Sequence, residues 1–369
     1  MISKKLIIFM PSIEGGGVEK NLFVVSNYLA SHINNVSIIT VSAKYKRKFK
    51  KKINFITTKF KTFDRLGRKA KYFIALFLLL KEIIKDKKLT VFCFQANIYC
   101  TILCKLMGVK IILRSNSSPS GWSQNFLKNI IFKIVLNLAD KVMVNSLEFK
   151  KELDLKFGIK SICIYNPLNI QEIVNKSKEK CRFNFFDHDK KSLKIINVGR
   201  FVIEQKDQIT LLKSINQIKS KISIKLLLVG RGIDYDNIRD YIKTHKLEKN
   251  VKIIKFQRNP YKFIAKSDLF VLSSRFEGLP NVLLEAACLK KFIISSNCPT
   301  GPSEILKNGK NGDLFEVGDY KNLSYKILKF NKTNSIIQKK IFNNYRDLHR
   351  FDLNTTLKKY LTLVSQYIY

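Results

Sequence analysis

Short apolar segments alternate with helical segments along the first half of the chain. Apolar runs of strand length lie at residues 4–10, 36–42, 53–57, 90–94, 109–115, 141–146 and 161–165. Segments with helical character lie between them, near residues 69–86, 97–107, 123–138 and 146–156. Repeated alternation of strand and helix predicts a parallel sheet with right-handed crossover connections.

The same alternation returns in the second half of the chain. Strands are predicted at residues 192–201, 224–232, 251–256 and 267–274, and a further strand, a Gly/Pro turn and a short helix within 290–319. We therefore expect an α/β protein with one Rossmann-like domain in residues 1–167 and a second in residues 192–350. Residues 168–191, with many Lys, Asp and Asn, are predicted to be a solvated linker. Residues 351–369 carry apolar positions at helical spacing and predict an amphipathic terminal helix.

The stretch RFEGLPNVLLEAA, residues 275–287, joins a buried strand to a helix. Such turns lie at the carboxyl ends of parallel strands, where the free N–H groups of the next helix attract anions and hydroxyl groups. Gly278 permits close backbone approach, and Pro280 suits the first helical position. Glu277 and Glu285 bracket the turn, so both carboxylates can point into one cleft. The alternative is a surface acid in a loop and a helix acid near a favourable dipole end.

Two cations follow the first strand of the second half. Arg200 comes directly after Gly199 at the strand end, and Lys206 lies six residues later at a helix start. This spacing lets both side chains converge on one diphosphate, Arg with two hydrogen bonds and Lys as a point charge.

A glycine-rich turn follows the first strand of the chain. Gly15, Gly16 and Gly17 precede a helix that starts near Gly17 and carries Glu19 in its first turn. Adjacent glycines let backbone N–H groups approach phosphate oxygens. The turn lacks the Lys-Ser/Thr pair of a Walker A loop and the third glycine of the dinucleotide pattern. A single turn with positive φ would explain one glycine but not three.

These motifs together resemble retaining glycosyltransferases of family 4, glycosyl transferases group 1, in the two-domain GT-B class. The resemblance rests on FEGLPNVLLEA, the Gly-Arg…Lys pair, GGGVE and GPSEIL, and is strongest from residue 193 to 318. It implies two Rossmann-like domains with parallel sheets facing across a cleft, with the acceptor in the first and a nucleotide sugar in the second. It also implies that the terminal helix, residues 351–369, crosses back to the N-terminal domain.

The resemblance assigns roles to individual residues. It implies that Glu277 and the amides after it meet the sugar hydroxyls, that Glu285 takes the ribose hydroxyls, and that Arg200 and Lys206 hold the phosphates. Glu277, Arg200 and Lys206 are thus the implied catalytic residues. The implied donor site comprises Gly199, Arg200, Lys206, Gly230, Phe256, Gln257, Glu277, Gly278, Leu279, Pro280, Asn281 and Glu285. The loop Gly15, Gly16, Gly17 and Glu19 is implied to lie across the cleft from the donor.

The polar loop SNSSPSGWS, residues 115–123, carries the acceptor candidates. Members of the family often have a His in this loop, and Asn116 stands in its place. Asn116 and Ser117 can hydrogen-bond a substrate hydroxyl, and Trp122 either stacks on a sugar or packs under the next helix. Asp234 and Asp236 match the metal-binding Asp-x-Asp only superficially, because they fall at a helix N-terminus where acids cap N–H groups. No metal or other cofactor is expected.

Composition adds the net charge, the cysteines and the longest apolar stretch to this picture. The 369 residues carry 68 Lys and Arg against 28 Asp and Glu, a net charge of +40. Such a charge predicts attraction to a polyanion, and composition bias toward Lys accounts for part of it. The seven cysteines are typical of buried, reduced thiols in a cytosolic protein. The apolar stretch at residues 72–84 is shorter than the ~20 residues of a membrane span and predicts a buried or interfacial helix.

The predicted reaction transfers a hexose or N-acetylhexosamine from a nucleoside diphosphate sugar and retains the anomeric configuration. We expect the nucleotide of the donor to be UDP. The acceptor would be a hydroxyl of a surface or lipid-linked glycan, and the protein would lie on the anionic inner face of the cytoplasmic membrane. One alternative is a sugar-nucleotide epimerase of the same architecture, separable by product analysis with and without an acceptor. Another is a non-catalytic polyanion binder. Against nucleic acid as the polyanion, no nucleic-acid module is recognised, and filter binding would test this.

Overall fold

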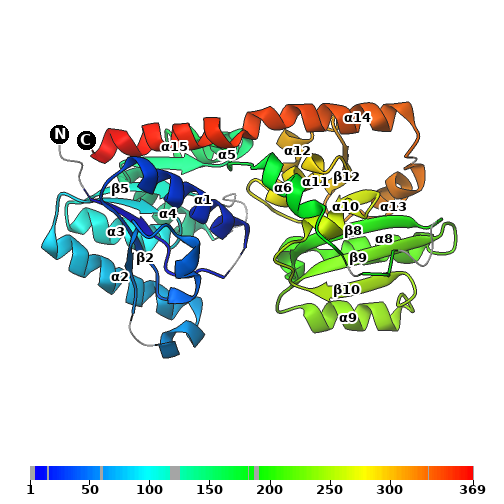
Figure 1. Ribbon diagram of the computed structural model, residues 1–369, viewed down its shortest axis with the longest axis horizontal. Helices are drawn as coiled ribbons and strands as arrows, with labels where there is room; N and C mark the ends of the chain where they lie inside the picture. The colour runs from blue at the N-terminus through cyan, green and yellow to red at the C-terminus, as the bar shows by residue number, and fades with distance from the viewer. Residues whose placement is uncertain are drawn as a thin grey trace. The chain divides into compact units, whose positions relative to one another are not determined.

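The computed structural model describes residues 5–14, 16–58, 61–116, 125–181, 183–186, 191–330 and 332–368 (Figure 1). The chain divides into two compact units. Unit 1 comprises Met1–Pro167 and Phe351–Tyr369, and unit 2 comprises Leu168–Arg350.

Within the described residues, unit 1 contains a seven-stranded sheet in the order β3-β2-β1-β4-β5-β6-β7. Its neighbouring strands are all parallel. The strands are β1 (Leu6–Phe9), β2 (Val36–Ile39), β3 (Asn54–Ile56), β4 (Thr90–Cys93), β5 (Lys110–Arg114), β6 (Lys141–Val144) and β7 (Ile162–Cys163). The strand order reverses between β1 and β4, which lie side by side.

Helices cover both faces of this sheet. They are α1 (Gly17–His32), α2 (Arg68–Lys85), α3 (Asn97–Leu106), α4 (Phe126–Leu138), α5 (Leu147–Phe157) and α15 (Leu353–Ile368), with 3-10 turns η1 (Ala43–Lys48) and η2 (Lys61–Arg65). Alternate residues of a strand point to opposite faces. Leu6 and Ile8 of β1 therefore join the core under α1 and α15, whereas Ile7 and Phe9 join the core under α2 to α5.

The terminal helix α15 belongs to unit 1. It buries Tyr360, Val364 and Ile368 against this sheet, and the Thr90 hydroxyl on β4 donates to the Tyr367 carbonyl at 3.0 Å. The amphipathic spacing predicted for residues 351–369 places these side chains on one side of the helix.

Within its described residues, unit 2 contains a six-stranded sheet in the order β10-β9-β8-β11-β12-β13. Its neighbouring strands are also parallel. The strands are β8 (Leu193–Arg200), β9 (Ile224–Arg231), β10 (Val251–Lys255), β11 (Leu269–Leu272), β12 (Phe292–Ser296) and β13 (Asp313–Phe315). Here the order reverses between β8 and β11.

The helices of unit 2 are mostly short. They are α6 (Ile170–Ser177), α7 (Ile203–Lys206), α8 (Gln208–Ile218), α9 (Tyr235–Thr244), α10 (Tyr261–Ala265), α11 (Asn281–Cys288), α12 (Pro302–Ile305), α13 (Tyr320–Lys329) and α14 (Ser335–Arg346), followed by the 3-10 turn η4 (Asp347–Phe351). Ile195, Leu226 and Val271 form one core with α8, α9 and α13. Helix α11 packs on β11 and β12.

The predicted strands and helices are confirmed in both units, but residues 168–191 are not wholly a linker. Residues 170–177 form α6, which packs against α10 and α11 in unit 2. The Asn169 side chain accepts from the Glu172 N–H at 3.0 Å and caps the helix, while Ile173 is buried. The polar composition of this segment reflects the outer side of a short helix. Within the described residues, no helix combines the length and the apolar composition that a membrane span requires.

We expect Gly230→Ala to destabilise unit 2. A Cβ at this position would lie 1.8 Å from the Gly199 carbonyl oxygen, so the ends of β8 and β9 would have to separate. Overpacking of this kind costs about 1–3 kcal/mol or more. Gly67→Ala is the control, because nothing lies within 4 Å of its added Cβ. Denaturant unfolding of both variants tests this, and equal stabilities would contradict it.

Candidate functional site

The candidate site lies where the strand order of unit 2 reverses. In open α/β sheets, ligands bind outside the carboxyl ends of the strands at such a reversal. The neighbours here are β8 and β11. Arg200 ends β8, Lys206 ends the short helix α7 that follows, and Glu277 lies in the loop after β11.

Lys206 and Glu277 form an ion pair across this point. The Ser274 hydroxyl donates to the same carboxylate oxygen, Oε1, at 2.6 Å. Glu277 is only 6% exposed, so its charge depends on these two donors for compensation. Burial and the Glu277 charge also raise the pKa of the neighbouring Cys298 to about 12.

A second turn braces the loop that carries Glu277. The Thr300 hydroxyl donates to the Glu277 carbonyl at 2.8 Å. Gly301 has φ +88°, and a Cβ there would lie 2.2 Å from the Gly278 carbonyl oxygen. Only glycine meets both conditions. The β12–α12 turn therefore fixes Gly278, Leu279 and Pro280, which are all buried, below the start of α11.

Arg200, the last residue of β8, is exposed. Its Nη2 donates to the neutral Gln205 side chain at 2.7 Å, and the Gln205 carbonyl accepts from the Arg275 N–H at 2.8 Å. Since an amide does not neutralise a guanidinium, the positive charge of Arg200 can still attract an anion. Gly199 lies beside the Lys206 side chain, since a Cβ built on this glycine would be 3.9 Å from Lys206 Cδ, and Arg200 follows it on β8.

Glu285 lies one turn into α11 and is only 3% exposed. Its Oε1 accepts from the Tyr261 hydroxyl of α10 at 3.3 Å. Burial raises the pKa of the Cys288 thiol on the same helix, and the Glu285 charge raises it further. The structure therefore places this carboxylate on the inner side of its helix, as predicted, and ties it to α10. Asn281, at the start of α11, is half-buried.

The remaining predicted donor residues lie at the ends of β9 and β10 or just after them. Arg231 lies 4.8 Å from the centre of the Phe256 ring in a cation–π contact. Gly230 has no Cβ, and this lets the Gly199 carbonyl of the neighbouring strand β8 approach its backbone.

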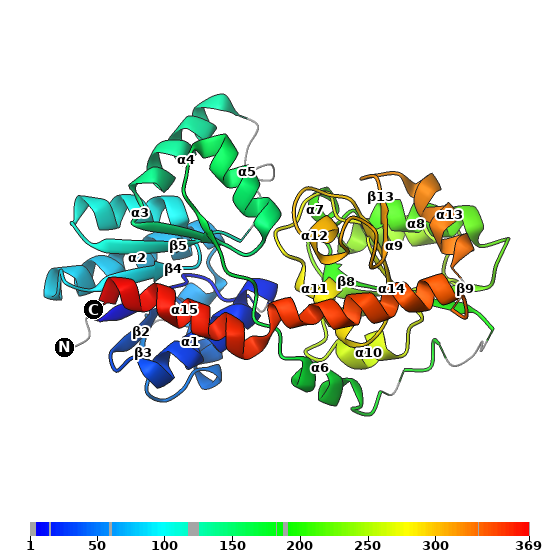
Figure 2. The ribbon, with the colours of Figure 1, turned by 90° about the horizontal axis from the view of Figure 1, so that it is seen from above.

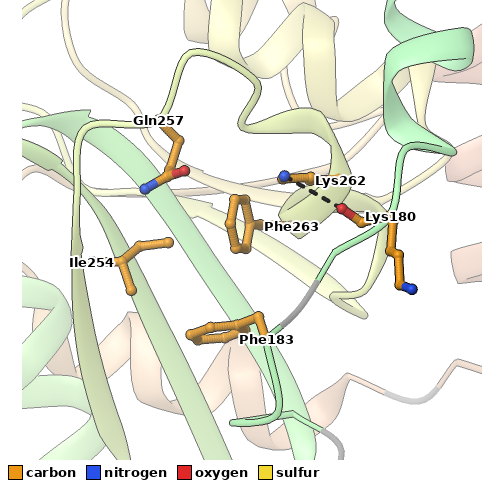
Figure 3. A pocket seen from close by; sticks show the side chains of 6 residues that line it. All are labelled: Lys180, Phe183, Ile254, Gln257, Lys262 and Phe263. Atoms are coloured by element: carbon orange, nitrogen blue, oxygen red, sulfur yellow. Dashed lines mark hydrogen bonds between the residues drawn. The ribbon is translucent and has the colours of Figure 1, made fainter.

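Gln257 lines a cavity of about 570 Å³ beside β10 and α10 (Figure 3). Phe183 and Phe263 meet edge to face there, with ring centres 5.5 Å apart. The other lining residues are Lys180, Ile254 and Lys262. Of the residues predicted for the donor site, Gln257 is the member that lines this cavity.

In unit 1 the glycine loop lies at the reversal between β1 and β4. The Ser12 N–H donates to the Gln95 side chain at 3.0 Å and joins the two loops. Glu19 is buried in the first turn of α1, and its Oε1 accepts from the Glu14 N–H at 3.2 Å. A Cβ on Gly16 would lie 2.9 Å from Glu19 Oε2. Glu19 therefore shapes the loop; Gly17 begins α1, and Gly15 lies outside the described residues.

Sequence reasoning missed Arg114, which is fully buried at the end of β5. Its guanidinium donates to the Tyr360 hydroxyl at 3.1 Å, to Asn166 Oδ1 at 2.7 Å and to Asn116 Oδ1. It also lies 5.1 Å from the centre of the Phe94 ring. The Arg114 guanidinium thus links three segments of unit 1: Asn116 at the start of the polar loop, Tyr360 on the terminal helix, and Asn166 in the chain after β7. The sequence feature that could have indicated this buried cation is an Arg at the end of an apolar strand.

The acceptor candidates are only partly described. Asn116 Nδ2 donates to the Phe94 carbonyl at 3.0 Å, and its Oδ1 accepts from Arg114, so the amide is engaged within unit 1. Ser117 and Trp122 lie outside the described residues.

Asp234 acts as a cap but not where expected. Its Oδ2 accepts from the Ile203 N–H at the start of α7, at 2.8 Å, instead of from its own helix. It therefore orients the loop that carries Arg200 and Lys206. Across the described residues, no group of three His, Cys, Asp or Glu side chains could hold a metal ion.

Comparison with known sequences finds a family that matches part of the chain. Residues 179–347 match the family described as Glycosyl transferases group 1. An uncharacterized glycosyltransferase of Methanocaldococcus jannaschii is 34% identical over 210 residues, 54% of this chain and 51% of that protein. The N-acetylgalactosamine-N,N'-diacetylbacillosaminyl-diphospho-undecaprenol 4-alpha-N-acetylgalactosaminyltransferase of Campylobacter jejuni is 27% identical over 63% of each chain. The matches thus span about half to three fifths of these relatives.

Solved structures extend the likeness to the whole fold. Anabaena HepE in complex with UDP superimposes with a TM-score of 0.76 at 17% identity, covering 98% of this chain and all of that one. Staphylococcus aureus TarM gives a TM-score of 0.74 at 13% identity, covering 98% of each chain. These likenesses confirm the expected fold class, two parallel Rossmann-like sheets of the GT-B type.

We expect Arg114→Met to destabilise the protein by about 2–4 kcal/mol, because the side-chain oxygens of the buried Tyr360 and Asn166 and of the half-buried Asn116 would lose this donor. Arg65→Met, at an exposed arginine of the same unit, is the control and should change stability by less than about 0.5 kcal/mol. Denaturant unfolding provides the comparison. An Arg114 variant as stable as its control would show that the buried cation contributes nothing.

Proposed function

We propose that this chain, whose residues 179–347 match the family described as Glycosyl transferases group 1, is a retaining transferase of family 4. It moves a hexose or N-acetylhexosamine from a nucleoside diphosphate sugar, UDP-linked, to a hydroxyl of a growing surface glycan or lipid-linked glycan. The observation that carries the proposal is the ion pair between Lys206 and the buried Glu277 at the β8–β11 reversal. HepE's complex with UDP and the diphospho-undecaprenol in the name of the Campylobacter enzyme support the choice of donor and acceptor.

The donor's diphosphate would bind at the loop after β8. Arg200 offers two parallel N–H donors, Lys206 offers a point charge, and the N-terminus of α11 adds its free N–H groups. All three would neutralise the negative charge that grows on the leaving phosphate.

Glu277 and Lys206 would change partners when the donor binds. Without donor, each neutralises the other inside unit 2. A diphosphate competes for the Lys206 ammonium, and the Glu277 carboxylate, still held by Ser274, becomes able to accept from sugar hydroxyls. Glu277 therefore orients the sugar and does not attack it. Glu285, bound to Tyr261, would accept the ribose hydroxyls.

The reaction itself would take place on one face of the sugar. The bond from the anomeric carbon to the leaving phosphate breaks as the bond to the acceptor oxygen forms, and the acceptor's proton passes to the phosphate. No protein nucleophile and no metal ion are required in this scheme, because side-chain cations supply the positive charge.

The acceptor suggests where the protein works. A lipid-linked glycan requires the enzyme to approach a bilayer, and a net charge of +40 favours an anionic surface. We therefore propose a cytoplasmic protein peripheral to the inner face of the cytoplasmic membrane, with no nucleic-acid partner.

The central test separates binding from transfer. Lys206→Met should weaken UDP-sugar binding roughly tenfold or more, because a charge-assisted contact to phosphate is lost. Glu277→Gln should retain UDP binding and lose roughly a hundredfold in transfer. Lys221→Met, at an exposed lysine after α8, should behave as the wild type. Calorimetry with a panel of UDP sugars and product analysis with and without acceptor provide the measurements. Near-wild-type turnover in the first two variants would refute these roles.

A separate measurement tests whether the transfer reaction needs a metal ion. Transfer by the purified enzyme should be unchanged in EDTA, since Arg200 and Lys206 neutralise the diphosphate in place of a divalent ion. Activity that disappears in EDTA and returns with Mg²⁺ or Mn²⁺ would contradict this part of the proposal.

A further inference from the structure

Helix α4 of unit 1 exposes most of its apolar side chains. Six of them, Phe126, Leu127, Ile130, Ile131, Ile134 and Leu138, are between 39% and 76% exposed. Within this helix, whose residues are all described, Val135 and Leu136 are the buried positions. The core of unit 1 therefore accounts for only one side of α4.

The neighbouring helices continue this surface. α3 packs against both α2 and α4 and lies between them (Figure 2). Phe73 of α2 and Tyr99 of α3 are both exposed, and their ring centres lie 6.3 Å apart. The surface, which we name the α2–α4 face, consists of Phe73, Phe77, Ile84, Tyr99, Ile102, Leu106 and the six exposed apolar side chains of α4.

Exposed charges on the three helices are of one sign. Lys69 and Lys81 of α2 and Lys128 and Lys133 of α4 are exposed, and the Lys81 ammonium lies 4.5 Å from the centre of the Phe77 ring. The acid of these helices, Glu82, is buried and bound by Lys5 and Lys85. The three helices themselves thus expose apolar and cationic side chains and no carboxylate, and the carboxylate of Asp140, just after α4, is bound by Lys105 of α3 at 2.5 Å.

An apolar surface of this extent indicates a partner. A second copy of the chain would bring like-charged lysines together, which costs free energy. An anionic bilayer satisfies both features, because its headgroup region accepts apolar side chains and its phosphates attract lysines.

We propose that the α2–α4 face docks unit 1 on an anionic lipid bilayer. The apolar side chains of α4 enter the boundary between headgroups and acyl chains, and Lys128 and Lys133 contact lipid phosphates. The assignment rests on the proposed function, since a lipid-linked acceptor requires an approach to the membrane. α4 also follows, along the chain, the loop that begins beside Asn116.

The test is flotation of the full chain with vesicles, in the absence of any nucleotide sugar. Wild-type protein should bind phosphatidylglycerol/phosphatidylcholine vesicles, bind pure phosphatidylcholine much less, and dissociate as salt increases. The double variant Ile131→Glu/Ile134→Glu should bind the anionic vesicles at least about tenfold more weakly than the wild type. The control, Ile336→Glu/Phe342→Glu, adds the same charge on α14 of unit 2 at side chains 65% and 62% exposed, against 51% and 56% on α4, and should bind as the wild type.

UDP-sugar binding, measured on the same samples, separates the two proposals. Lost flotation with intact donor binding in the α4 variant supports the docking face. Equal flotation of the α4 variant and the wild type overturns it, whatever the donor result. A wild-type protein that ignores anionic vesicles and forms a dimer broken by the α4 substitutions also overturns it. Absence of donor binding in every sample would refute the transferase, while flotation would still decide the face.

Discussion

The ion pair between Lys206 and the buried Glu277 is the constraint on which the candidate site of unit 2 depends. Two opposite charges lose hydration when they are buried, and this cost is offset only in close contact with further hydrogen bonds. Lys206 comes from the β8 side of the strand-order reversal and Glu277 from the β11 side. The surrounding contacts, from Ser274 and Thr300, fix the loop in the position where the two charges meet.

Both units use the same topological device with different chemistry. In unit 1 the reversal lies between β1 and β4, where Ser12 bonds to Gln95 and Glu19 holds the backbone of the glycine loop. The ion pair that this loop makes, between Glu14 and Arg68 of α2 at 2.7 Å, is exposed, unlike the Lys206–Glu277 pair of unit 2. A cation instead appears further along the sheet, where Arg114 is buried among oxygens from three separate segments.

Patterns in short stretches of sequence predicted the features that depend on interactions between residues close together in the chain. Strand and helix positions follow from apolar periodicity, and the neighbourhood of Arg200, Lys206 and Glu277 follows from strand ends that meet at one sheet edge. The partners of Arg114 could not be predicted, because Asn166 and Tyr360 lie 52 and 246 residues away in sequence. The role of Gly230 depends equally on a distant carbonyl. Helix α6 was missed because its polar outer side dominates its composition.

Net charge alone does not identify a partner, and the placement of the lysines shows why. In unit 2 several lysines pair with acids, among them Lys307 with Asp347 and Lys340 with Asp313. Such pairs stabilise the surface modestly and leave little field beyond it. On α4, by contrast, Lys128 and Lys133 stand among exposed apolar side chains in a helix that contains no acid. Lysines of unit 1 also pair with acids, as Lys85 does with Glu82, so the place of Lys128 and Lys133 on α4 is what distinguishes them. The arrangement of the charges therefore carries the functional information.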